Sequence, residues 1–106
     1  AWAIMPNHVH ALVRPLEPHD VTGIVFSWRS YSANQANRLL ERHGKFWDRD
    51  YFDRFIRDEA HLLRAIGYIE MNPVKAGLCA VPEAWPYSSA AWRRRSQGAL
   101  LKEPSL

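Results

Sequence analysis

Residues 58–71 show the clearest helical pattern in the sequence, and this pattern limits the possible folds most. Apolar residues recur there at the spacing of one helix face, and Asp58 stands where an N-cap is expected. The apolar residues of this face are Leu62, Ile66 and Ile69. Pro73 predicts that the helix ends or that a new short helix begins, which Gly77 can close. The chain therefore contains at least one helix with an apolar face that should pack on a core.

Two short apolar runs, at residues 2–5 and 9–13, predict adjacent strands because the Pro6-Asn7 pair between them favours a turn. A second amphipathic helix of about five turns is expected between Asp20 as N-cap and Gly44 as helix stop. Residues 46–56 mix aromatics with both charges and predict one or two strands around a tight turn. Residues 82–106 are rich in Pro, Trp, Ser and Arg and predict an irregular tail.

The size of the chain restricts it to one domain, since it has 106 residues. Its single cysteine cannot form an internal disulfide, and no hydrophobic run approaches the roughly 20 residues of a membrane helix. We therefore expect a soluble protein of the cytoplasm with no membrane partner. Residues 1–5 already form an apolar run without a start methionine, so we expect an N-terminal part of the natural protein to precede Ala1.

His8 and His10 stand two residues apart in an extended run, so their side chains should point to the same face. Two neutral imidazoles on a rigid strand provide much of a small divalent-metal site. Val9, between them, should point the other way and be buried. The alternative is a pair of surface histidines that bind no ligand.

Tyr68 lies off the apolar seam of its helix, and Asn72 follows it by one turn. The two side chains form a small polar face, which Arg64 and His61 share. Each also has a simpler interpretation: Tyr68 as half-buried packing, and Asn72 as the N-cap of a turn that begins at Pro73.

Arginines beside aromatic residues are suited to phosphate contact and base stacking. The candidate nucleic-acid contacts are Arg49, Arg54, Arg64, Trp92, Arg93, Arg94 and Arg95. The formal net charge is only +3, and aspartates stand among the arginines, so surface ion pairing is the competing explanation.

The sequence contains four ordered blocks at residues 5–10 (MPNHVH), 46–51 (FWDRDY), 68–78 (YIEMNPVKAGL) and 85–90 (WPYSSA). Together they resemble the single-tyrosine HUH transposases, and most closely the REP-associated tyrosine transposases. The resemblance runs from residue 1 to about residue 90. It implies a catalytic domain over residues 1–90, followed by a basic, irregular tail over residues 91–106.

The resemblance implies an α+β, ferredoxin-like antiparallel sheet with packed helices, from which an N-terminal strand and helix are missing. It implies that His8 and His10 are the metal-binding pair, that Tyr68 is the nucleophile, and that Asn72 is a third metal ligand. It also implies Mg²⁺ or Mn²⁺ as cofactor, although two imidazoles bind Zn²⁺, Ni²⁺ or Cu²⁺ more tightly.

The function implied is that of an enzyme, a DNA transposase that cuts and rejoins single-stranded, hairpin-containing DNA through a 5′-phosphotyrosine. It would act in the bacterial cytoplasm as a monomer or homodimer. Two alternatives are a non-catalytic protein of the same fold that binds DNA hairpins, and a metal-dependent hydrolase that uses a bound water while Tyr68 only packs.

Overall fold

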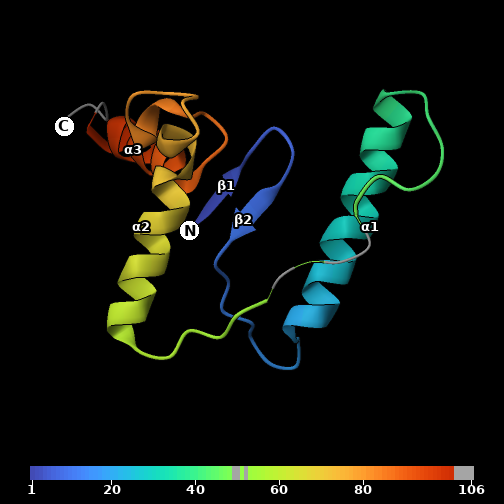
Figure 1. The fold of residues 1–106 in the computed structure, drawn as a ribbon, viewed down its shortest axis with the longest axis horizontal. Helices are drawn as coiled ribbons and strands as arrows, with labels where there is room; N and C mark the ends of the chain where they lie inside the picture. Colours follow the sequence, from blue (N-terminus) through green and yellow to red (C-terminus); the bar gives the residue numbers. More distant parts are fainter. Residues whose placement is uncertain (49–50, 52, 102–106) are drawn as a thin grey trace. The chain divides into compact units, whose positions relative to one another are not determined.

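The computed structural model describes residues 1–48, 51 and 53–101, which form two compact units. The hairpin unit comprises residues 1–12 and the chain from residue 56 onward, and the α1 unit comprises residues 13–55. Two strands, three α-helices and a short 3-10 helix are present in the described residues, as labelled in Figure 1. The expected α+β class is thus confirmed. No helix in the described part is long and apolar enough to span a membrane.

The two expected strands form an antiparallel hairpin, β1 (Trp2–Ile4) and β2 (Val9–Ala11). The turn between them is closed by a 2.8 Å hydrogen bond from the Met5 amide to the His8 carbonyl. The other edge of β1 is paired as well, since the Ile4 amide donates to the Tyr87 carbonyl at 2.8 Å. Strand β1 is therefore held from both sides.

The expectation that Val9 is buried is wrong. Val9 is 43% exposed, and Ile4, its partner across the two strands, is 47% exposed. Ala3 on the opposite face is fully buried. Within the described residues only the face that carries Ala3 is covered, so the side chains that alternate with it stay in contact with solvent.

Helix α2 (Glu59–Lys75) begins as expected, with the Asp58 carboxylate accepting a 2.7 Å hydrogen bond from the His61 amide. The expectation that the helix ends at Pro73 is wrong, because α2 continues through the proline to Lys75. Pro73 is fully buried, and its carbonyl accepts from the Leu78 amide at 2.9 Å. Packing of the ring outweighs the loss of one helical hydrogen bond.

The helix is instead terminated by Gly77, which lies two residues after Lys75 and has a φ of +76°. This left-handed conformation is the usual one for a glycine just after a helix, because a side chain would be strained there. Since α2 is continuous, Asn72 lies inside it and does not serve as the N-cap of a new turn.

The expected irregular segment after residue 82 is in fact ordered over most of its length, as a 3-10 turn at Pro82–Ala84 and helix α3 (Ser89–Leu101). Residues 102–106 lie outside the described residues. Ser88 accepts a hydrogen bond from the Ala91 amide at 3.3 Å, in the manner of an N-cap. Ala90 and Ala91 are buried. The helix forms because a capping serine precedes small residues that pack closely.

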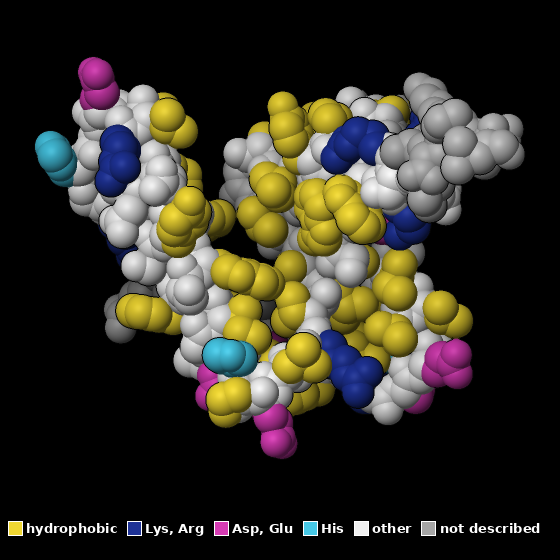
Figure 2. Space-filling view, turned by 180° about the vertical axis from the view of Figure 1, so that it is seen from behind, with side chains coloured by type: hydrophobic (Ala, Val, Ile, Leu, Met, Phe, Trp, Pro, Cys, Tyr) yellow, Lys and Arg dark blue, Asp and Glu magenta, His cyan; other side chains and the backbone are white. Residues whose placement is uncertain are grey.

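In the α1 unit, helix α1 (Val21–Leu39) is capped by Asp20, whose carboxylate accepts from the Gly23 amide at 2.7 Å. The helix stops at Leu39, earlier than expected. The chain leaves it through Glu41, which has a φ of 52°, well before Gly44. No residue of α1 is buried. Its hydrophobic side chains, like others of the chain, lie at the surface (Figure 2).

The expectation of strands within residues 46–56 is wrong for the described residues of that segment, none of which is in a strand. Residues 49, 50 and 52 lie outside the described residues. Here the chain is bonded to α1 through side chains. The Trp47 indole donates to the Ser32 hydroxyl at 2.9 Å, and the Arg29 guanidinium donates to the Asp48 carbonyl. A strand needs a neighbouring backbone to pair with, and these contacts do not provide one.

Candidate active site

The hairpin places His8 and His10 on one side of the sheet. His10 is paired with Ala3 across the strands, and His8 stands two residues earlier at the turn. Ala3 and Met5 on this face are buried. His10 contacts Tyr68 of α2, so this is the face that carries the packed helix.

The two imidazoles lie close enough to share one cation. Their Nε2 atoms are 3.1 Å apart, and their rings meet edge to face with centroids 4.8 Å apart. Two ligand nitrogens that each lie about 2.1 Å from a common metal ion are separated by roughly 3 Å. The observed spacing thus fits the donor set of a divalent metal site.

Asn7 orients the first of these rings. The Asn7 side-chain oxygen lies 2.6 Å from Nδ1 of His8, so an N–H at Nδ1 donates to it. This tautomer leaves the lone pair of His8 on Nε2, the atom that faces His10. An outer hydrogen bond of this kind typically holds a metal-binding histidine in place. Asn7 was not expected to contribute, although its position directly before His8 was a signal for it.

Burial lowers the pKa of His10 below its ordinary value, and the neighbouring His8 lowers this pKa further. Both effects disfavour a charged imidazole. Both effects thus favour the neutral form of His10, which is the form that binds a metal ion.

Helix α2 brings Tyr68 to this pair. The next residue, Ile69, is buried against the core, and this fixes the rotation of the helix so that Tyr68 lies on its flank. The Tyr68 ring is 5.8 Å from the His10 ring, centroid to centroid, and is 55% exposed. An exposed phenol thus stands beside the imidazole of His10.

Asn72 lies one turn further along the same helix and is half-buried. Within the described residues its side-chain amide makes no hydrogen bond, so the amide oxygen is available as a ligand. No group of three or more His, Cys, Asp or Glu side chains that could hold a metal is present in that part of the chain. Among the residues that the structure describes, a third protein ligand for the histidine pair would therefore be another kind of group, such as an amide oxygen, and Asn72 carries one on the same helix as Tyr68.

Helix α2 also carries a buried carboxylate to which the sequence patterns gave no role. Glu70 is 8% exposed and accepts from the Ser89 hydroxyl at 2.7 Å and from both terminal nitrogens of Arg93, at 2.7 and 3.0 Å. The Arg93 hydrogen bond, the largest effect, lowers the pKa of Glu70, while burial opposes it. Ser89 also accepts from the Trp2 amide at 2.9 Å, so this network joins β1, α2 and α3. The sequence signal for the burial of Glu70 was its position four residues after Ile66, on the core side of the helix.

The network around Glu70 includes Arg93, which is one of the residues expected to contact DNA. Arg93 is paired with Glu70, so two of its guanidinium nitrogens already have a partner within the protein. Arg64, Arg94 and Trp92 are exposed in the hairpin unit, with Trp92 57% exposed. Arg95 donates to the Pro86 carbonyl at 3.4 Å.

Two other expected DNA contacts belong to the α1 unit. Arg54 is exposed there, and Arg49 lies outside the described residues.

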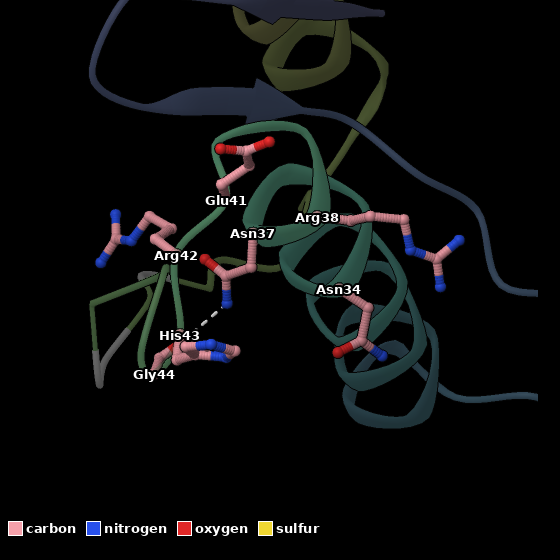
Figure 3. A pocket seen from close by; sticks show the side chains of 7 residues that line it. All are labelled: Asn34, Asn37, Arg38, Glu41, Arg42, His43 and Gly44. Carbon is pink, nitrogen blue, oxygen red and sulfur yellow. Dashed lines mark hydrogen bonds between the residues drawn. The ribbon is translucent and has the colours of Figure 1, made fainter.

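A hollow of about 590 Å³ lies in the α1 unit and holds none of the candidate catalytic residues (Figure 3). Its lining residues are Asn34, Asn37, Arg38, Glu41, Arg42, His43 and Gly44. The arginine side chains there point away from each other, and the Asn37 amide donates to the Gly44 carbonyl at 2.8 Å. The hollow therefore does not gather groups for a reaction.

Sequence comparisons show which family and which proteins this chain is similar to. The sequence model of the family described as "Transposase IS200 like" matches residues 1–72. A protein of Haemophilus influenzae, provisionally named a REP-associated tyrosine transposase, is 31% identical over 99 residues, which are 84% of this chain and 56% of that protein. The REP-associated tyrosine transposase of Escherichia coli is 25% identical over 89 residues, covering 84% of this chain and 52% of that protein.

The chain thus spans about half the length of these two curated relatives. No solved structure matches it. The family match covers residues 1–72, including both histidines, Tyr68 and Asn72, and it agrees with the resemblance found from the four sequence blocks. The chain therefore belongs to the family of IS200-like transposases.

Proposed function

We propose that this chain is the catalytic part of a transposase that cuts and rejoins single-stranded DNA through Tyr68. The observation that carries the proposal is the contact between the rings of His10 and Tyr68, with His8 beside them. An exposed phenol beside a candidate metal site fits phosphoryl transfer to a tyrosine better than it fits packing.

In the proposed step, the Tyr68 oxygen attacks the scissile phosphorus and the bond from phosphorus to the 3′ oxygen breaks. The products are a 5′-phosphotyrosine and a free 3′-hydroxyl, so the phenolic proton is transferred, in net terms, to the leaving oxygen. The energy of the phosphodiester bond is kept in the adduct, and a second 3′-hydroxyl can reverse the step without ATP.

His8, His10 and Asn72 would hold Mg²⁺ or Mn²⁺. The chemistry supplied by this cation, when bound, is the neutralisation of charge on a non-bridging oxygen of the phosphate. A phenol has a pKa of about 10 in water and is a weak nucleophile near neutral pH, so it needs such assistance. The neutral form of His10, favoured by its lowered pKa, supports this donor role.

We further propose that the two strands and the helices of the hairpin unit belong to a ferredoxin-like domain, and that the DNA contains a hairpin. Arg64 and Arg94 are exposed cations of this unit that can contact phosphates. Trp92, also exposed, offers a flat face to an unpaired base.

The decisive experiment is incubation of the protein with hairpin-containing single-stranded DNA and Mn²⁺, followed by mass analysis of the peptides. We expect a peptide that carries DNA on Tyr68. Tyr68→Phe should reduce this adduct at least about 10³-fold because it removes the nucleophile, with DNA binding retained. Omission of the metal together with addition of EDTA should have a similar effect.

Tyr87→Phe is the matched control, because Tyr87 is 58% exposed, close to the 55% of Tyr68, and its ring contacts Trp85 instead of a histidine. Cleavage that survives in Tyr68→Phe would instead favour a hydrolase that uses a bound water. If the unsubstituted protein binds the DNA hairpin but does not cleave the DNA, the result would favour a non-catalytic DNA-binding protein.

A further inference from the structure

We infer that Lys75 is a further catalytic residue of this site, whose ammonium group stabilises the negative charge on the Tyr68 oxygen and on the phosphate under attack. This inference rests on the proposed function, because it assigns Lys75 to the same reaction. It concerns a residue to which neither the sequence patterns nor the comparisons gave a role.

The geometry that supports it lies on one face of α2. Lys75 comes seven residues, close to two full turns, after Tyr68, so the two side chains share a face of the helix. The Lys75 ammonium lies over the Tyr68 ring, 5.5 Å from its centroid. Asn72 stands between them in sequence, one turn after the tyrosine, so the polar face of α2 runs from the phenol to the ammonium.

The charge of Lys75 is not used elsewhere in the described residues. It forms no ion pair there, since the salt bridge of that part of the chain joins Arg93 and Glu70. Glu70, the acid nearest to Lys75 along α2, is bonded to Arg93 and Ser89. The positive charge therefore remains available for an anionic substrate.

A lysine in the last turn of a helix is also favourable for a simpler reason, its attraction to the negative end of the helix dipole. That attraction explains the position of Lys75 in the sequence but not the placement of its ammonium over the tyrosine ring. The two roles have different consequences: the dipole affects stability, whereas a catalytic role affects the rate.

The chemistry follows from the charge that develops during attack. As the bond from Tyr68 to phosphorus forms, negative charge is spread over the phenol oxygen, its ring and the phosphate oxygens. A fixed cation over the ring attracts this charge more than it attracts the neutral phenol. The attraction strengthens when bound DNA displaces water from the exposed site.

The test compares Lys75→Gln and Lys75→Arg with Lys45→Gln, which removes the same charge from an exposed lysine of the α1 unit. The rate of adduct formation is measured with saturating hairpin DNA and Mn²⁺, and the Kd for the DNA is measured separately. We expect Lys75→Gln to slow adduct formation about 10²-fold, as loss of one charge-stabilising group does. Its Kd should change less than about 3-fold, because one phosphate contact contributes little to overall binding.

Lys75→Arg should form the adduct at least about ten-fold faster than Lys75→Gln, because it restores the charge. Lys45→Gln should form the adduct at the rate of the unsubstituted protein. Circular dichroism checks that each variant folds; if Lys75→Gln does not, Lys75→Met repeats the test with a neutral chain of similar length.

Three results would overturn the inference while the proposed function stands: an unchanged rate in Lys75→Gln, a loss confined to Kd, or no recovery in Lys75→Arg. If the unsubstituted protein forms no adduct, the proposed function itself fails, and the role of Lys75 fails with it.

Discussion

The hairpin unit and the α1 unit differ in how they use apolar side chains. In the described residues, the buried apolar residues all belong to the hairpin unit; they are Ala3, Met5, Ile69, Pro73, Ala90 and Ala91. Helix α1 has no buried residue, and its Phe26 and Leu39 are 74% and 82% exposed. Both units have a capped helix, but as far as the chain is described only the hairpin unit combines it with buried apolar residues. The candidate active site lies on that core, which fixes the positions of its side chains.

The largest expected effect in this comparison comes from truncating an apolar side chain in each unit. Ile69→Ala removes a side chain that is 7% exposed, and it should lower the free energy of unfolding by about 2–5 kcal/mol because it leaves a cavity. Leu39→Ala should change that free energy by less than about 0.5 kcal/mol. Urea unfolding followed by circular dichroism measures both, and equal effects would contradict the contrast between the units.

A smaller loss in the free energy of unfolding is expected at low pH, where Glu70 becomes protonated. Its pKa is lowered in the folded state, so its stabilising contribution is fully present above the ordinary glutamate value of about 4.5 and is lost as the pH falls through the lowered pKa. We expect a loss of about 1.5 kcal/mol, the low end for a charge-assisted bond, because the Arg93 side chain is half exposed.

The measurement is the free energy of unfolding from pH 7 down to pH 3 for the protein and for Glu70→Gln, in which this part of the pH dependence should disappear. Glu41→Gln, at an exposed acid of the α1 unit, should leave the pH dependence as it is. A Glu70→Gln profile that follows the unsubstituted one would show that the network does not set the acid stability.

The smallest expected effect is that of removing a helix N-cap, which should destabilise the helix of each unit by nearly the same amount. Asp20→Ala and Asp58→Ala each remove an N-cap carboxylate that accepts a 2.7 Å hydrogen bond. Each should destabilise its helix by about 1 kcal/mol, because capping depends on the first turn and not on the core. The helical signal in circular dichroism during thermal unfolding reports this loss, and Asp→Asn at each position should preserve most of the cap. A much larger loss for Asp58 would show that capping of α2 is coupled to the core.

Local chemistry explains which features of the fold were predictable from the sequence. The turn at Pro6-Asn7, the caps at Asp20 and Asp58 and the stop at Gly77 each depend on residues within one turn of each other. For the same reason, the alternation of a strand predicted that His8 and His10 share a face. The family could also be recognised from the sequence, because ordered blocks of residues carry the resemblance, and the family match confirms it.

Other expectations failed because they depended on contacts between distant residues. Pro73 remains inside α2 because its ring is buried, and the segment after residue 82 becomes a helix that packs its alanines. Val9 is exposed because the described residues do not cover its face of the sheet.

The sequence by itself determined the local elements, the identity of the candidate site residues and the family, because these follow from neighbouring side chains and from residue order. Only the tertiary structure brought Tyr68 to His10, paired Glu70 with Arg93 and left Lys75 over the phenol without an ion pair in the described residues. These arrangements depend on how α2 is rotated against the hairpin and α3. That rotation is set by the simultaneous burial of Ala3, Ile69 and Pro73, which no short stretch of sequence can specify alone.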